Sequence, residues 1–130
     1  MQATMVEVLP DTNALLMIFQ FKINLEQELT RLLGKYEISI PDCVFKELKK
    51  LSLSERHAKS ALRYAERYNR IAVDRDGNVD DIILEYAKES KSKKGTLVVL
   101  TNDKELRKKL KASKIQVAFL RGGSHLVLEE

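Results

Sequence analysis

Residues 96–103 read Thr-Leu-Val-Val-Leu-Thr-Asn-Asp, an apolar run that ends in three polar side chains. A run that is apolar at every position, rather than at alternate ones, is typical of a strand buried on both faces of a parallel sheet. The basic stretch of residues 104–112 follows at once and predicts a helix. A buried strand that leads straight into a helix indicates an α/β fold.

The same alternation of strand and helix extends over the rest of the chain. We expect strands at residues 5–10, 36–40, 71–73 and 115–120, and helices at residues 13–20, 24–34, 42–51, 54–70 and 79–90. Ser54 is the expected N-cap of the helix 54–70, and Gly122-Gly123 should turn the chain into a short tail. This pattern predicts a single domain, residues 1–130, built as a three-layer α/β/α sandwich around a central parallel sheet of about five strands.

The composition excludes several classes of protein. With 130 residues, 44% of them hydrophobic, the chain suits one compact core. One Cys and two His argue against a disulfide scaffold and against a thiolate or histidine-rich metal site, and they favour a reducing compartment. The sequence shows neither a signal peptide nor an apolar stretch of roughly 18 residues. We therefore expect a soluble cytoplasmic protein that does not enter a membrane.

The charge is unevenly distributed along the chain. The net charge is +4, but residues 88–114 hold ten of the 23 Lys and Arg and only three of the 19 acids. This segment therefore carries +7, whereas the remaining 13 basic and 16 acidic residues sum to −3. A basic segment on an acidic body indicates a polyanionic partner such as nucleic acid, with solubilising surface lysines as the alternative.

Two predicted strands end in a carboxylate beside Thr and Asn. Asp11 follows residues 5–10, and Asp103 follows residues 96–100. Ligands of open parallel sheets bind beyond the carboxyl ends of the strands, so both acids are candidate site residues. Helix capping is the alternative, because Asp is a favoured N-cap.

Two predicted helices carry acids on or near their apolar sides. At roughly 100° per residue, Glu47 falls with the apolar side chains of helix 42–51, and Asp80 with those of helix 79–90. Asp81 lies at the border and, with Asn78 as N-cap, imitates a capping box. A buried carboxylate costs several kcal/mol unless it is paired, protonated or bound to a metal. Glu47 and Asp80 are therefore candidate ligands, and a salt bridge at the edge of the core is the alternative for each.

Together these residues place four acids, with Asp80 or Asp81 as the third, on four elements of the predicted sandwich. Clustered carboxylates repel one another unless a cation neutralises them, and ligands that offer only oxygen suit Mg²⁺ or Mn²⁺. Such a site hydrolyses phosphodiester bonds by activating a water and stabilising charge on the attacked and leaving oxygens. The basic segment 88–114 would then receive the phosphate backbone.

Four blocks of the sequence resemble the PIN-domain ribonucleases, in family order and over residues 6–120. They are Val-Leu-Pro-Asp-Thr-Asn-Ala-Leu-Leu at 8–16, Ile-Pro-Asp-Cys-Val-Phe-Lys-Glu-Leu-Lys-Lys-Leu at 40–51, Val-Asp-Asp-Ile-Ile at 79–83 and Leu-Thr-Asn-Asp-Lys-Glu-Leu at 100–106. The residues of the last two blocks resemble those of archaeal single-domain relatives of the nucleolar endonuclease that processes small-subunit ribosomal RNA precursors. Bacterial VapC toxins share the acids, but the residues around the acids are less similar.

The resemblance implies a sheet in the order 3-2-1-4-5 and metal-dependent endonuclease activity on RNA. It implies Mg²⁺ or Mn²⁺ as the cofactor, and it leaves a homodimer open. Thr101 matches the small hydroxyl residue that orients the last acid, and Asn13 is a second supporting residue. The implied ligands are Asp11, Glu47, Asp80 and Asp103, with Asp81 as an extra or alternative third ligand.

Cations on the predicted helix 54–70 suggest where RNA would lie. Five of them fall within about 80° of one another on the helix, and Tyr64 and Tyr68 are available for base stacking. A solvated face of an amphipathic helix is the alternative. The stripe consists of Arg56, Lys59, Arg63, Arg67 and Arg70, and the basic helix 104–112 adds Lys104, Arg107 and Lys108.

Three other functions compete with a metal-dependent endoribonuclease. A catalytically silent RNA-binding or assembly module would keep the acids for structure, and only metal-dependent turnover separates it from an enzyme. A toxin paired with an antitoxin partner is a narrower rival, less favoured here, which gene neighbourhood would decide. A phosphoacceptor receiver domain needs a Lys after the last strand, whereas Arg121 ends that strand here.

Overall fold

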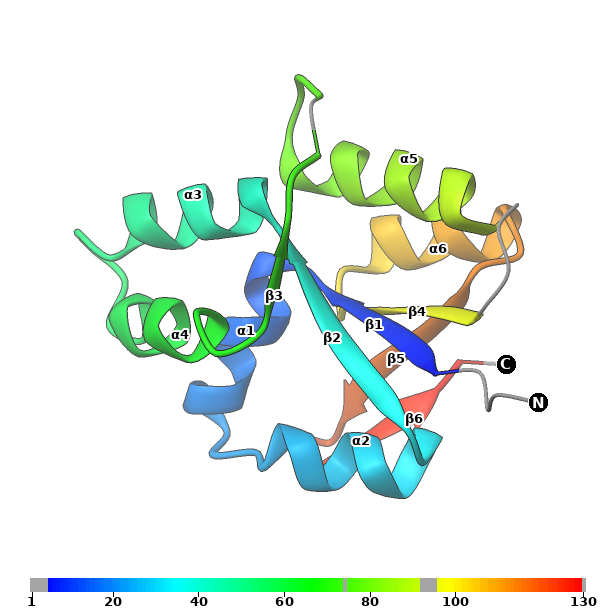
Figure 1. Cartoon of the computed structure of the whole chain (residues 1–130). Helices are drawn as coiled ribbons and strands as arrows, with labels where there is room; N and C mark the ends of the chain where they lie inside the picture. The colour runs from blue at the N-terminus through cyan, green and yellow to red at the C-terminus, as the bar shows by residue number, and fades with distance from the viewer. Residues whose placement is uncertain (1–4, 74, 92–95, 130) are drawn as a thin grey trace.

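The computed structural model describes residues 5–73, 75–91 and 96–129 as one layered α/β body (Figure 1). Its strands are β1 (Val6–Pro10), β2 (Tyr36–Pro41), β3 (Asn69–Ile71), β4 (Thr96–Leu100), β5 (Gln116–Arg121) and β6 (His125–Leu128). Its helices are α1 (Thr12–Gln20), α2 (Leu25–Leu33), α3 (Asp42–Leu51), α4 (Ala58–Ala65), α5 (Val79–Lys91) and α6 (Lys104–Ala112). The elements alternate as the sequence predicts.

The strands form one sheet in the order β3-β2-β1-β4-β5-β6. The first five strands run parallel, with β1 between β2 and β4, which confirms the predicted order 3-2-1-4-5. The tail was predicted without a strand, but it forms β6, which pairs antiparallel with β5. Gly122 and Gly123, with φ of 62° and 65°, make the tight reversal that this hairpin needs.

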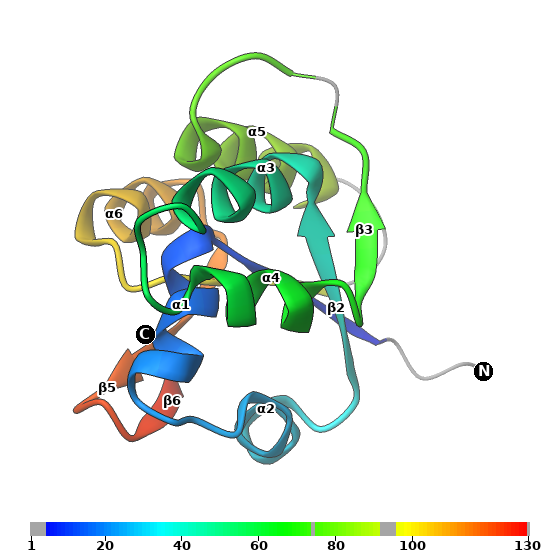
Figure 2. The same cartoon turned by 90° about the vertical axis from the view of Figure 1, so that its left-hand side faces the viewer.

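The helices cover both sides of the sheet. Helices α5 and α6 lie on one side, whereas α1, α2 and α4 lie on the other (Figures 1 and 2). Helix α3 packs against α4 and α5 near the carboxyl end of β2. The central strands are buried on both faces: Val8, Leu9, Val98 and Val99 are each at most 1% exposed. This burial explains why the sequences of β1 and β4 lack a clear polar face.

The prediction of one helix over residues 54–70 is wrong. Residues 54–57 form turns, α4 spans only Ala58–Ala65, and Asn69 already belongs to β3. Residues 69–71 leave the helical path because they pair in parallel with residues 39–41 of β2. The predicted stripe of five cations is therefore broken: Arg56 precedes α4, and Arg70 lies on β3.

Within the described residues, no helix is long and apolar enough to cross a membrane.

Candidate active site

Asp11 lies in the first position after β1, where the central strand passes into α1. Its backbone is extended, with φ −84° and ψ 177°, and its Oδ1 accepts a hydrogen bond of 2.8 Å from the Ala14 N–H. The second oxygen, Oδ2, accepts from the hydroxyl of Thr101. Asp11 is therefore the N-cap of α1, as the capping interpretation predicts, but it is only 3% exposed and also bound to the neighbouring strand end.

The surroundings of Asp11 raise the pKa of its carboxyl group. Burial raises its pKa to about 6, hydrogen bonds from Thr101 and Ala14 oppose the rise, and repulsion from Asp80 and Asp103 adds to it. In the unfolded chain the pKa lies near 3.8. Because the folded state holds this proton more tightly, the protein should lose stability as the pH rises from about 4 to about 6. A nearby cation would favour the ionised form instead.

Thr101 connects the two acids that follow strands β1 and β4. Its side chain is completely buried, its hydroxyl donates to Asp11, and the same oxygen accepts from the Asp103 N–H at 3.1 Å. Asp103 in turn caps α6 by accepting from the Leu106 N–H at 2.9 Å. One hydroxyl thus holds two carboxylate-bearing turns side by side.

Asn102 has a positioning role that the sequence analysis did not assign. Its Nδ2 donates to the carbonyl of Leu120 at 3.0 Å, and its Oδ1 accepts from the Leu120 N–H at 2.7 Å. The side chain therefore joins the β4 turn to β5 as a further strand would. The sequence offered one indication of this role, namely the position of Asn102 between Thr101 and Asp103. The backbone of a neighbouring strand needs hydrogen-bond partners where the regular ladder ends, and a side-chain amide in the turn can supply them.

Asp80, in the first turn of α5, faces the same cluster. It is half-buried, and its pKa is raised by burial first and then by repulsion from Asp103, Glu47 and Asp81. Lys109 of α6 acts in the opposite direction on this carboxyl. These interactions place Asp80 among the other acids, as its position within the apolar arc of α5 predicts.

Asp81 is exposed, and its backbone has the expected structural role. The Asp81 N–H donates to Asn78 Oδ1 at 2.9 Å, so Asn78 caps α5 as predicted. The two adjacent acids thus differ in burial, and Asp80 is the one drawn into the cluster.

The prediction that Glu47 points with the buried side of its helix is wrong. Glu47 is exposed, whereas Val44, Phe45 and Leu48 are buried. At roughly 100° per residue, these three side chains centre the apolar side about 100° away from Glu47. Cys43 and Leu51, the apolar residues that flank Glu47 around the helix, are only half-buried. Glu47 nevertheless lies near enough to Asp80 to repel its charge.

The donor set suits a hard divalent cation. Acids from different elements lie near enough to affect one another: Asp80 and Asp103 both raise the pKa of the buried Asp11 carboxyl. Within the described residues, no three His, Cys, Asp or Glu side chains lie close enough to hold one ion between them. Mg²⁺ commonly keeps several waters and takes one or two direct carboxylates, so this spacing fits such an ion better than a closed protein cage.

Two further polar side chains lie in the first turn of α1. The Thr12 hydroxyl is buried and has no hydrogen-bond partner among the residues that the structure describes. Asn13, predicted as a supporting residue, is exposed beside it. Buried polar groups normally find a partner, so the Thr12 hydroxyl is available to a water or ligand at this end of the sheet.

The cations predicted to contact RNA differ in their surroundings. Arg67 pairs with Glu26 at 3.2 Å, and Arg107 pairs with Glu129 at 2.9 Å and stacks over Phe119. The remaining four, Arg56, Arg63, Lys104 and Lys108, are exposed. The last two lie on α6, the helix that begins at Asp103.

Comparisons with known proteins agree with this architecture. The family model of the PIN like domain matches residues 8–123, a span that contains all five candidate acids. The chain is 38% identical over 125 residues to Ribonuclease VapC4 of Methanocaldococcus jannaschii, and the match covers 90% of this chain and 92% of that protein.

A solved structure shares the fold. The PIN domain endonuclease Utp24 matches with a TM-score of 0.81 and 29% sequence identity, over 95% of this chain and 90% of that one. Both proteins are nucleases by name, and both match almost from end to end.

Proposed function

The chain belongs to the PIN-like domain family, and from this we propose that it is an endoribonuclease that depends on Mg²⁺ or Mn²⁺. The observation that carries the proposal is the buried pair of turns at the carboxyl ends of β1 and β4. There Thr101 holds Asp11 and Asp103 together, and Asp80 faces them from α5. A structural role alone would not require burying one acid among others that repel it.

In this proposal Asp11, Glu47, Asp80 and Asp103 would hold the cation, one or two of them directly and the others through its waters, and Asp81 is an alternative third ligand. When bound, the cation supplies positive charge that activates a water and stabilises the leaving oxygen. Thr101 orients the Asp11 carboxylate by donating to one of its oxygens. Ionised Asp11 is needed for this role, so cation affinity should increase as the pH rises through about 6.

RNA would approach along exposed cations beside the acids. Lys104 and Lys108 extend from α6, and their charges would pair with phosphates on one side of the scissile bond. Arg56 and Arg63 lie before and within α4 and would contact a more distant part of the backbone. Arg107 and Arg67 already have carboxylate partners, so we assign them weaker RNA contacts.

The substrate we propose is a structured RNA precursor in the cytoplasm, with small-subunit ribosomal RNA as the leading example. The blocks around Asp80 and Asp103 support it by their resemblance to proteins that process this RNA. A VapC-type toxin is the second candidate, favoured by the 38% identity to a protein named VapC4. An adjacent antitoxin gene would support the toxin, and a solitary gene would support the processing enzyme.

Adjacent acids in α5 provide a matched pair of variants. Asp80→Asn should lower cleavage by about 100-fold or more, because an inward ligand is lost, whereas Asp81→Asn should lower it only a few-fold. Both variants remove one negative charge from the same helix turn. Initial rates on a labelled RNA in Mn²⁺ measure the difference. A larger loss for Asp81→Asn would assign the third ligand to Asp81 instead, and equal losses would contradict a role for Asp80 alone.

A further inference from the structure

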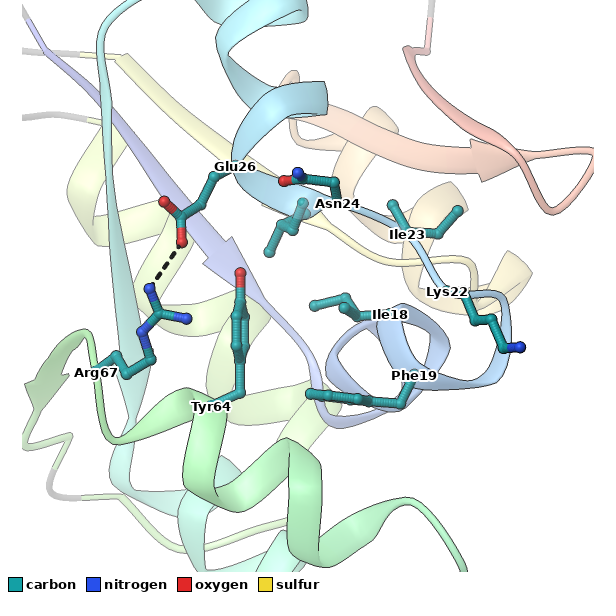
Figure 3. Close-up of a pocket in the computed structure, with 9 residues that line it drawn as sticks. Ile18, Phe19, Lys22, Ile23, Asn24, Glu26, Tyr64 and Arg67 are labelled. Atoms are coloured by element: carbon teal, nitrogen blue, oxygen red, sulfur yellow. Dashed lines mark hydrogen bonds and ion pairs between the residues drawn. The ribbon is translucent and has the colours of Figure 1, made fainter.

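A cavity lies at the opposite end of α1 from Asp11. Figure 3 shows it between the last turn of α1, the start of α2 and the end of α4, and its volume is about 570 Å³. Helix α1 has nine residues, so the two sites are about 13 Å apart along its axis. This volume falls within the range of sites that bind small molecules or single nucleotides.

Aromatic rings give the cavity a firm wall. The ring of Tyr64 meets Phe19 edge-on, with centroids 5.8 Å apart and planes at 83°. Its hydroxyl lies 2.8 Å from the hydroxyl of Tyr68, which also donates to Glu26 at 2.8 Å. Ile18 and Ile23 lie across the opening from the Tyr64 ring (Figure 3). A ring held in this way presents a face on which a flat ligand can stack.

The rim of the cavity is charged and carries a net +1. Arg67 lies 5.2 Å from the Tyr64 centroid and forms an ion pair with Glu26 at 3.2 Å. Lys22 is exposed on the other side of the opening. Asn24 Oδ1 accepts from the Gln27 N–H at 3.1 Å, which leaves its Nδ2 as a donor. Because Arg67 and Glu26 neutralise each other, Lys22 supplies the net charge of the rim, which suits an anionic group on the ligand.

We propose that this cavity binds one nucleotide of single-stranded RNA away from the cleavage site. The base would stack on Tyr64, Asn24 would donate to its edge, and its phosphate would pair with Lys22. This inference rests on the proposed ribonuclease function, since the same RNA would extend to the acids at the other end of α1. It adds a contact that selects unpaired RNA near the cut.

Two pairs of variants test the cavity. Tyr64→Leu removes the stacking face but keeps an apolar side chain, whereas Tyr64→Phe keeps the ring. Lys22→Asn removes the charge at a residue with φ 54°, a backbone conformation that Asn tolerates. Lys114→Asn is its matched control, because Lys114 is also exposed, has φ 59° and follows α6 on the other side of the sheet. Thermal unfolding verifies that each variant folds.

The measurement is the affinity for a labelled single-stranded RNA of about 16 nucleotides, by fluorescence anisotropy in EDTA so that no cleavage occurs. We expect Tyr64→Leu to bind about 10-fold more weakly, from the usual strength of base stacking. Lys22→Asn should bind about threefold more weakly, with a shallower salt dependence. Tyr64→Phe should bind like the wild type. Lys114→Asn, at the end of the basic segment 88–114 and away from the cavity, should lose less than about twofold in affinity, clearly less than Lys22→Asn.

Unchanged RNA affinity in Tyr64→Leu would overturn the proposal and leave the cavity to a ligand of another class, such as a polypeptide. An equal loss in Lys22→Asn and Lys114→Asn would also overturn it, because only general charge would then be at work. Failure of the nuclease function has a separate readout, because the wild type would then leave the same RNA intact in Mn²⁺. The affinities measured in EDTA would still test whether the cavity binds RNA.

Discussion

Asp11→Asn should abolish RNA cleavage and at the same time stabilise the protein at neutral pH. Loss of a cation ligand removes several kcal/mol of transition-state stabilisation, so the rate should fall at least roughly 1,000-fold. The fold should survive because Asn is as good an N-cap as Asp, and its Oδ1 can still accept from Ala14. Initial rates in Mn²⁺ measure the first effect.

The stability effect follows from the proton on Asp11. The pKa is about 6 in the folded protein and 3.8 in the unfolded chain, so ionising this buried carboxyl costs about 3 kcal/mol by pH 7. The cost is absent below about pH 4 and complete above about pH 6. Asp11→Asn should therefore unfold at higher denaturant concentration than the wild type at pH 8 in EDTA, with the difference vanishing near pH 4.

Glu37→Gln is the matched control for both effects. It removes one negative charge from an exposed side chain near the start of β2, at the end of the sheet away from the acids. Its cleavage rate and its pH-dependent stability should equal those of the wild type. If the Asp11→Asn variant cleaved RNA at the wild-type rate, Asp11 would not be part of the active site.

Thr101→Val should weaken both the fold and the site. The substitution keeps the shape of a fully buried side chain but leaves Asp11 Oδ2 without its donor and the Asp103 N–H without its acceptor. At about 1–3 kcal/mol for each unsatisfied group, the protein should lose about 3 kcal/mol of stability. Cleavage should fall about 10–100-fold, as when a residue that orients a metal ligand is lost.

The pH profile separates this positioning role from general destabilisation. The Thr101 hydrogen bond lowers the pKa of Asp11, so its loss should move the pH of half-maximal cleavage upward from the wild-type value. Thr101→Ser keeps the hydroxyl and should restore both the profile and most of the rate. A slower enzyme with an unchanged profile would show that Thr101 acts only through stability.

The sequence predicts the centre of the fold well, and it predicts that Asp11 and Asp103 follow neighbouring strands at the same edge of the sheet. Strands β1 and β4 are mostly apolar because their last three residues are buried on both faces, and each is followed by an Asp that caps a helix. Parallel strands bring their carboxyl ends to one edge of the sheet. The proximity of Asp11 and Asp103 can therefore be predicted without any knowledge of side-chain contacts. Local pattern and topology agree here, which is why the prediction holds.

The errors occur where distant contacts override local pattern. Residues 66–70 continue the helical spacing of α4, but residues 69–71 gain a parallel partner in β2 and leave the helix. Strand β6 depends on pairing with β5, and its edge at Leu126 is held by Glu28 and Arg31 of α2. A four-residue apolar run does not reveal such partners.

Glu47 shows the limit of helical periodicity near a site. Its position was inferred from an apolar arc that counted Cys43 and Leu51 together with Val44 and Leu48. Cys43 and Leu51 are only half-buried, whereas Val44 and Leu48 are buried and define the inner side of the helix. A carboxylate at the edge of the apolar side of a helix can approach a cluster of acids without being buried. The spacing of apolar residues does not distinguish such a carboxylate from a buried one. Asp80, which was placed within the apolar arc of its helix, is half-buried.

The most direct test of the account is cleavage of end-labelled single-stranded and structured RNA by the purified protein in Mn²⁺, with and without EDTA. The account predicts internal cuts in at least one RNA in Mn²⁺ and none in EDTA, because the clustered acids act through a divalent cation. Cleavage that persists undiminished in EDTA would contradict the metal site. RNA that is bound but never cut would contradict the enzyme and favour a binding module.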